Sequence, residues 1–188
     1  MKRLLLLLLL GSSLPLAAQD MPRSVKEIRQ LYAEVQQGIA SMSDEPHSCR
    51  QLVSNFQYNV PGTGIRKETQ TVYFSEYGDN DGWTEEGDWK PDYRPFFLTR
   101  KYNIAAHRFY EEYLYDRDSG RLVFVFLQGD SWEDAQGKDE TRYYFGPEGL
   151  ISESIKGERL ESVENILKKA GTLYEAARTS FAASVSWL

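Results

Sequence analysis

The loop at residues 77–93, YGDNDGWTEEGDWKPDY, gathers the side chains best suited to bind a ligand. Counted from Tyr77, acidic residues stand third, fifth, ninth and twelfth and Gly82 stands sixth, close to the calcium-binding loop of an EF-hand. Tyr77 itself occupies the first position, where such a loop needs an oxygen ligand, and the flanking sequence is strand-like rather than helical. We therefore prefer a solvated loop without a metal, with calcium as the alternative.

Aromatic residues in the same loop predict a binding surface. Trp83, Trp89 and Tyr93 lie there, and Trp132 lies in a later loop, QGDSWEDAQGKDE. Aromatic side chains combine a large contact area with a polar edge, so these four would form a flat platform for a sugar ring or a peptide. The alternative is that the tryptophans pack back over the sheet and anchor two long loops.

Patterns typical of catalysis are weaker. His47 and His107 are far apart and lack the spacing of a metal site or a triad, and His47 with Cys49 would form a dyad without an orienting partner. Glu111 and Glu112 are neighbours on a predicted strand, so they point to opposite faces and cannot flank one bond. A hydrolase would have to bring together scattered carboxylates: Asp88, Asp92, Glu111 and Asp130.

Sequence motifs of nucleophilic or cofactor-dependent chemistry are also lacking. The chain has no Gly-x-Ser-x-Gly, phosphate-binding loop or dinucleotide fingerprint. We therefore expect no cofactor, and we prefer a non-catalytic protein to the carboxylate hydrolase.

The acidic stretch from Asp116 to Gly120 is interpreted as a turn. It separates two strand-like runs, Tyr113–Tyr115 and Leu122–Leu127, by five residues, which is a hairpin-loop length. Aspartate and serine bond to nearby backbone N–H groups in turns, and glycine tolerates a positive φ. A calcium loop that began at Asp116 would place Leu127 twelfth, where an acid is required.

The elements that must position these residues are two helices and a sheet. Ser24 and Glu27 have capping-box spacing, and an apolar stripe with helical period follows to residue 39. Short aromatic and β-branched runs with turn signals between them then predict seven strands, and their short links imply antiparallel neighbours. The predicted strands span residues 50–59, 66–77, 96–104, 107–116, 121–128, 141–146 and 149–155.

The run from Leu122 to Leu127 is apolar at every position, which predicts that both faces of the sheet are covered. A second helix follows, because apolar residues recur three and four apart: Leu160, Val163, Leu167, Ala170, Tyr174, Ala177 and Phe181. The apolar seam of this helix predicts that it packs on the sheet, and a coiled-coil dimer is the alternative. The fold class is therefore α+β: an N-terminal helix, an antiparallel β-meander of about seven strands and a long C-terminal helix packed on the sheet.

The N-terminus predicts export. Lys2 and Arg3 precede seven leucines, and small residues end at Ala18, as in a secretory signal peptide. Removing residues 1–18 leaves a single domain, residues 19–188, and lowers the formal charge of the chain from −6 to −8. We expect a periplasmic or secreted protein without a membrane span after cleavage. The acidic balance argues against nucleic acid and leaves an unknown protein, peptide or glycan as partner.

Two hairpins share a design, YD…SGRL at 115–122 and YYF…EGLI at 143–151. These pieces resemble the turn of YD-type repeat proteins, although the first carries one inserted residue at 116–120. The layout of signal peptide, helix, aromatic meander and RYYF..EGLI is similar to exported bacterial proteins of uncharacterised families. This resemblance implies an aromatic β-meander, and it implies no active site.

Overall fold

The computed structural model describes residues 21–42, 50–77, 92–134 and 136–185. Within these ranges the chain forms two helices and seven strands. In chain order they are α1 (Val25–Ala40), β1 (Arg50–Val60), β2 (Gly64–Tyr77), β3 (Asp92–Ile104), β4 (His107–Tyr115), β5 (Leu122–Asp130), β6 (Lys138–Gly146), β7 (Gly149–Lys156) and α2 (Val163–Val185).

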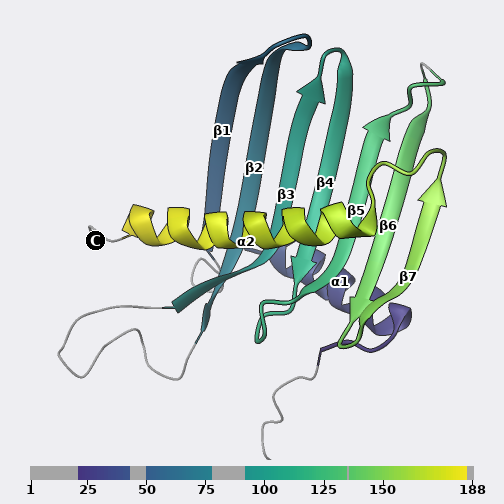
Figure 1. Ribbon diagram of the computed structural model, residues 1–188. Coiled ribbons are helices and arrows are strands. Elements are labelled where there is room, and N and C mark those ends of the chain that lie inside the picture. Colours follow the sequence, from purple (N-terminus) through teal and green to yellow (C-terminus); the bar gives the residue numbers. More distant parts are fainter. Residues whose placement is uncertain (1–20, 43–49, 78–91, 135, 186–188) are drawn as a thin grey trace, which may run out of the picture.

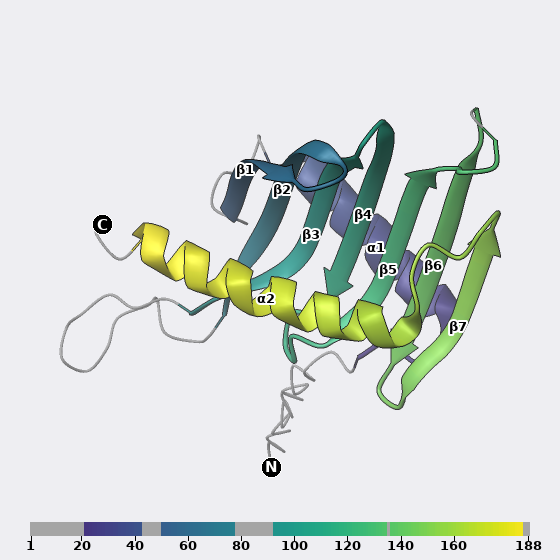
Figure 2. The same ribbon diagram turned by 45° about the horizontal axis from the view of Figure 1, so that its top comes forward.

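The strands form one antiparallel sheet in which spatial order follows chain order, from β1 at one edge to β7 at the other. One helix crosses each face of this sheet, with α2 on the near face and α1 behind in Figures 1 and 2. The predicted α+β meander with the C-terminal helix packed on the sheet is therefore confirmed. Covering both faces explains why β5 is apolar on both sides, since alternate residues of this strand meet different helices.

The core beneath α1 is built from residues that follow the helical period. The side chain of Ser24 caps the first turn by accepting from the N–H of Glu27 at 3.2 Å. Ile28 and Val35, which are two helical turns apart on the same stripe, are both buried in the cluster that contains Phe97 and Phe124.

The core beneath α2 is larger. Ile166, Ala170 and Phe181 are buried, and the ring of Phe181 stacks on Phe74 of β2 with centroids 4.3 Å apart. The predicted seam is wrong at one position, because 48% of Leu167 is exposed and its neighbour Ile166 is buried instead. A stripe of 3.6-residue period drifts across a regular heptad, and Ile166 rather than Leu167 falls over the sheet.

The turn predicted at 116–120 is confirmed. The Oδ1 atom of Asp116 accepts from the N–H of Ser119 at 2.7 Å and from its hydroxyl at 2.6 Å. Gly120 takes a φ of 68°, in the left-handed region that favours glycine. The acidic side chain therefore closes the hairpin between β4 and β5.

The strand boundaries differ from prediction mainly at β3, which begins at Asp92, four residues before the predicted start at 96. Tyr93 thus belongs to the sheet. Its ring packs edge-on against Phe181 and is 8% exposed, so burial extends the strand into the segment predicted as loop. The proposed signal peptide, residues 1–18, lies outside the described residues. No helix among the described residues has the length and apolar character needed to span a membrane.

Candidate ligand-binding cleft

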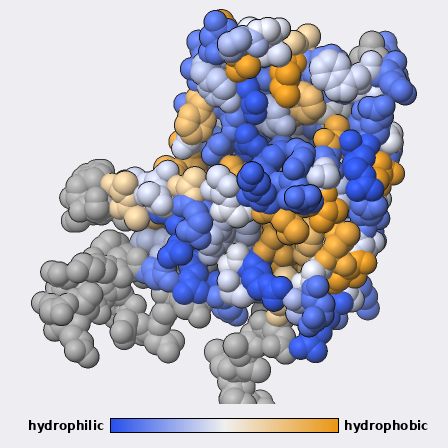
Figure 3. Space-filling model, in the orientation of Figure 1, coloured by the Kyte–Doolittle hydropathy of each residue, from blue (hydrophilic) through white to orange (hydrophobic). Residues whose placement is uncertain are grey.

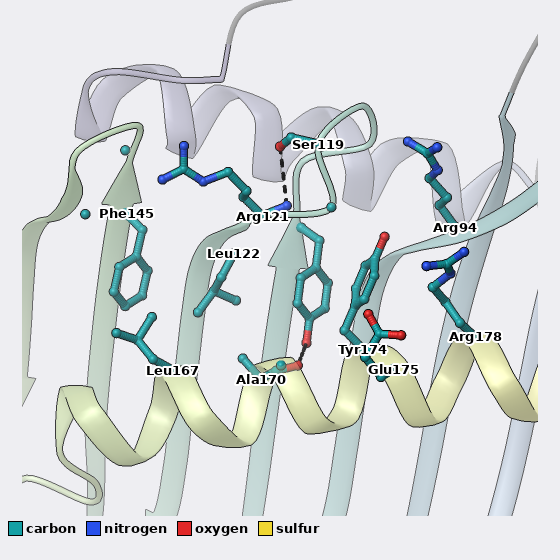
Figure 4. A pocket seen from close by; sticks show the side chains of 15 residues that line it. Arg94, Ser119, Arg121, Leu122, Phe145, Leu167, Ala170, Tyr174, Glu175 and Arg178 are labelled. Carbon is teal, nitrogen blue, oxygen red and sulfur yellow. Dashed lines mark hydrogen bonds between the residues drawn. The ribbon is translucent and has the colours of Figure 1, made fainter.

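A cleft of about 750 Å³ opens between α2 and the turns that join β4 to β5 and β6 to β7 (Figure 4). Its volume is in the range of pockets that take small molecules or a few peptide residues. Both the helix and the two hairpins must be in place to form it. The residues that line it include Arg94, Gly120, Arg121, Leu122, Phe145, Leu167, Ala170, Tyr174, Glu175 and Arg178.

One half of the cleft is apolar. Leu122 and Phe145 rise from the sheet to face Leu167 and Ala170 of α2 in Figure 4. This apolar surface continues onto β7, where Leu150 lies opposite Phe145 of β6 and is 44% exposed. Figure 3 shows this region as the broad hydrophobic area near the β7 end of α2. An exposed apolar surface that continues into a cleft is typical of a binding site.

Three arginines line the cleft, and their positions come from three different elements. Arg94 lies at the start of β3, Arg121 follows the β4–β5 turn, and Arg178 extends from α2 toward Arg94 in Figure 4. Glu175 is the one acidic residue among the described residues that line the cleft, and Asp92 lies beside Arg94 and Arg178. A lining with more guanidinium groups than carboxylates favours an anionic ligand.

The three guanidinium groups are held to different degrees. Arg121 donates to the carbonyl of Pro147 at 2.6 Å and so joins the two turns, while Arg94 donates to Asp92 at 2.9 Å and to the carbonyl of Asp118 at 2.7 Å. Arg178 is 44% exposed and reaches Asp92 only at 3.6 Å. Arg178 is thus the guanidinium that can turn to a ligand with the least loss of protein contacts.

Two tyrosines separate the apolar half from the pair Arg94 and Arg178. The hydroxyl of Tyr115 donates to the carbonyl of Ala170 at 2.9 Å, and its ring lies 5.0 Å from that of Tyr174. Burial raises the pKa of both hydroxyls, so they are neutral at physiological pH. Tyr174 therefore contributes a neutral hydroxyl to the wall of the cleft.

The structure does not bring the described members of the predicted aromatic platform together. Tyr93 is at the start of β3, whereas Trp132 follows β5, and these points lie at opposite ends of the strands in Figure 1. Trp132 is 59% exposed and its ring lies 3.6 Å from that of His107. Trp83 and Trp89 lie outside the described residues, as do Asp88 and the predicted calcium ligands of 79–88.

Of the carboxylates proposed for a hydrolase, Glu111 has the most unusual surroundings. It lies under α2, with 4% of its side chain exposed, and accepts from Arg100 at 2.8 Å. The hydroxyls of Tyr102 and Tyr113 donate to it at 2.8 and 2.7 Å, and the ammonium of Lys169 lies 3.3 Å away. As predicted, Glu111 and its neighbour point to opposite faces of the sheet.

Glu68 on β2 shares the Arg100 guanidinium with Glu111. Arg100 reaches Glu68 at 2.7 Å, and Gln70 and Arg66 donate to the same carboxylate at 2.7 and 3.2 Å. We call these groups, Arg66, Glu68, Gln70, Arg100, Tyr102, Glu111, Tyr113 and Lys169, the buried charge network. Sequence reasoning identified Glu111 alone, because pairing Arg100 with Glu111 requires the register of β3 and β4.

The buried charge network holds both carboxylates ionised. Burial by itself raises the pKa of Glu111, but the charges of Arg100 and Lys169 and the two tyrosine hydroxyls outweigh it and leave the pKa below its usual value. For Glu68, the hydrogen bonds from Gln70 and Arg100 likewise overcome burial and lower the pKa. Neither carboxyl can serve as the proton donor that paired-carboxylate hydrolysis needs.

The two other described carboxylates of the hydrolase hypothesis lie far from each other along the strands. Asp92, at the start of β3, pairs with Arg94, and Asp130, at the end of β5, pairs with Arg108 at 3.2 Å. Figure 1 places these strand ends on opposite sides of α2. Among the described residues, the carboxylates of the hydrolase hypothesis, Asp92, Glu111 and Asp130, therefore form no convergent pair in the cleft.

Comparison of the chain with family models, curated proteins and solved structures found no match. The interpretation of the cleft accordingly depends on its own geometry. Sequence reasoning missed its three arginines, and the only local signal was the placement of Arg121 directly after a hairpin turn and of Arg178 one helical turn beyond Tyr174.

Proposed function

We propose that this protein is an exported, non-catalytic binding module whose cleft holds a short peptide segment with an acidic group beside a large apolar side chain. The observation that carries the proposal is the pairing of an apolar floor, Leu122, Phe145 and Leu167, with the guanidinium groups of Arg121 and Arg178 in one cavity. Arginine forks match carboxylates in geometry and charge. The apolar side chain would supply contact area and the carboxylate would supply orientation.

A peptide suits this cleft better than a glycan. Sugar rings bind to flat aromatic faces that are open to solvent. Here the aromatic ring of the floor, Phe145, and the ring of Tyr115 beside it are 3% and 2% exposed, so neither presents an open face to a sugar. An exposed leucine, Leu167, instead offers its methyl groups to a ligand.

A binding role also suits the protein better than hydrolysis. Two buried carboxylates, Glu68 and Glu111, are bridged by Arg100, and both groups have lowered pKa values. Two ionised carboxylates that share one guanidinium leave no protonated acid for chemistry.

Isothermal titration calorimetry tests the proposal. The probes are two capped tetrapeptides, acetyl-Leu-Phe-Glu-Asp-amide and its uncharged counterpart acetyl-Leu-Phe-Gln-Asn-amide. We expect the mature chain to bind the acidic peptide at least about tenfold more tightly, which corresponds to one charge-assisted hydrogen-bonded pair.

Two variants locate the binding. Arg178→Ala removes an exposed cation and Leu167→Gln removes an exposed apolar group, so each should weaken binding of the acidic peptide about tenfold without unfolding the protein. Arg108→Ala, an arginine with 80% of its side chain exposed at the other end of the sheet, is the matched control and should bind normally. Equal affinity for both peptides, or unchanged affinity in both cleft variants, would contradict the proposal.

A further inference from the structure

The edge strand β1 lacks the features that normally keep a sheet edge from pairing. It is 11 residues long and pairs with β2 on one side, and no described strand pairs with its other side. From Gln51 to Val60 the sequence QLVSNFQYNV contains no charged residue, proline or glycine. Natural edge strands are usually short or carry lysine, proline or bulges, because a long uncharged edge recruits another strand.

The opposite edge does carry such protection. Strand β7 is 8 residues long and includes Glu153 and Lys156. Glu153 pairs with Arg159 at 2.7 Å, which places a fixed ion pair beside the strand. The two edges of the same sheet therefore differ in charge, and within the described ranges β1 is the edge without this protection.

Apolar side chains of β1 also face solvent. Phe56 and Tyr58 are 45% and 44% exposed, and they lie on the same face of the sheet as Leu52, which packs against the core beneath α2. On the other face Val53 is 50% exposed. Strand β7 also exposes large apolar side chains, Leu150, Ile151 and Ile155, but on β1 they lie along a strand without a charged residue after Arg50. An uncharged edge with exposed apolar side chains is the combination that favours pairing with another strand.

Helix α2 extends past this edge. In Figures 1 and 2 its C-terminal end lies beyond β1, on the side away from β2. The final turns of α2, which end at Val185, thus project over the position that an added strand would occupy. The helix is thus displaced toward the β1 edge of the sheet and does not extend past β7 at the other edge (Figure 1).

We propose that two copies of this chain pair through β1, antiparallel about a two-fold axis at Asn55, so that their sheets become one continuous sheet. Asn55 is the middle residue of β1, and pairing about it engages the strand from Arg50 to Val60 in both copies. In an antiparallel pair opposite residues share a face, so both α2 helices then lie on the same side. This inference is independent of the proposed function of the cleft.

Pairing through β1 would cover the exposed aromatic side chains of this strand and would also explain why the end of α2 projects beyond the sheet. It places Leu52 of each copy opposite Tyr58 of the other, because the two positions are equally far from Asn55. Each α2 passes over its own Leu52, so its projecting end reaches the row of Tyr58 and Phe56 in the second copy. The single charged residue of β1, Arg50, lies opposite Val60, so no like charges meet.

Sedimentation equilibrium of residues 19–188 tests the pairing. We expect a monomer–dimer equilibrium without larger species, since a two-fold interface closes on itself. Asn55→Lys places two lysines opposite each other and should weaken dimerisation at least about tenfold. Gln57→Lys should also weaken it, and the matched control Ile155→Lys, at a 40% exposed position on β7, should dimerise normally.

Disulfide cross-linking tests the register. In a Cys49→Ser background, which removes the one native cysteine, Asn55→Cys should cross-link two copies on mild oxidation because this residue faces itself. Gln51→Cys should not, since its opposite residue is Asn59. A monomer at all concentrations, open-ended filaments, or a dimer that survives both lysine substitutions on β1 would overturn the inference.

Discussion

At the scale of single residues, Glu111 shows how the fold uses a buried acid. Its carboxylate has a guanidinium, an ammonium and two tyrosine hydroxyls within 3.3 Å. Each of these groups favours the ionised form, and together they overcome the effect of burial. The lowered pKa of Glu111 is therefore a consequence of a structural ion network that connects β3 and β4 with α2.

This network predicts how stability depends on pH. The pKa of Glu111 is lower in the folded chain than its unfolded value of about 4.3, so its contribution is complete above that value and is lost as pH falls through the folded pKa. Urea unfolding between pH 7 and pH 3 should show this loss. Glu111→Gln should be less stable at pH 7 by about 3 kcal/mol, because Arg100 and Lys169 each lose one of their two carboxylate partners, and should lose less stability on acidification.

The control for this prediction is Glu148→Gln, at the exposed turn between β6 and β7. It should change the free energy of unfolding at pH 7 by no more than about 0.5 kcal/mol. If Glu111→Gln retained the full acid-induced loss of stability, Glu111 would not be the group responsible.

At the scale of elements, the β4–β5 turn and α2 approach each other at one glycine. A Cβ atom on Gly120 would lie 2.5 Å from the hydroxyl oxygen of Tyr174, and the residue also has a positive φ. Glycine at this position therefore satisfies two demands, a turn conformation and close contact with the helix that forms the cleft.

Gly120→Ala should destabilise the protein for both reasons, and Gly62→Ala separates them. Gly62 has a φ of 84° in the β1–β2 turn but has open space around its Cβ position, so alanine there costs only the left-handed conformation, about 1–2 kcal/mol. Chemical denaturation should show a loss at Gly120 that exceeds the loss at Gly62 by about 1 kcal/mol or more. Equal losses would mean that Tyr174 moves away freely.

Elements were predictable where the pattern was local. The alternation in β4 and β5 and the Asp116–Gly120 turn identified a hairpin, and short links identified the meander. The start of β3 was not predictable, because contact with Phe181 of α2 decides that Tyr93 is buried. For the same reason the cleft was missed: its arginines come from positions 94, 121 and 178, which only the tertiary fold brings together.

At the scale of the whole molecule, the sheet has two different ends. One end carries the cleft between α2 and the hairpin turns, and the other carries the β5–β6 link with Trp132 against His107. Both ends were candidates for binding from sequence, since aromatic residues were predicted in loops at each. The arginines and the apolar floor occur together at the cleft end, which is why we propose binding there.

The most direct test of this assignment is an amide chemical-shift titration of the mature chain with acetyl-Leu-Phe-Glu-Asp-amide. We expect the largest changes at the amides of Gly120, Leu122, Leu167 and Gly171, which line the cleft. Amides near Trp132 and His107 should remain unperturbed. Changes confined to the Trp132 end, or no changes at saturating peptide, would contradict the account.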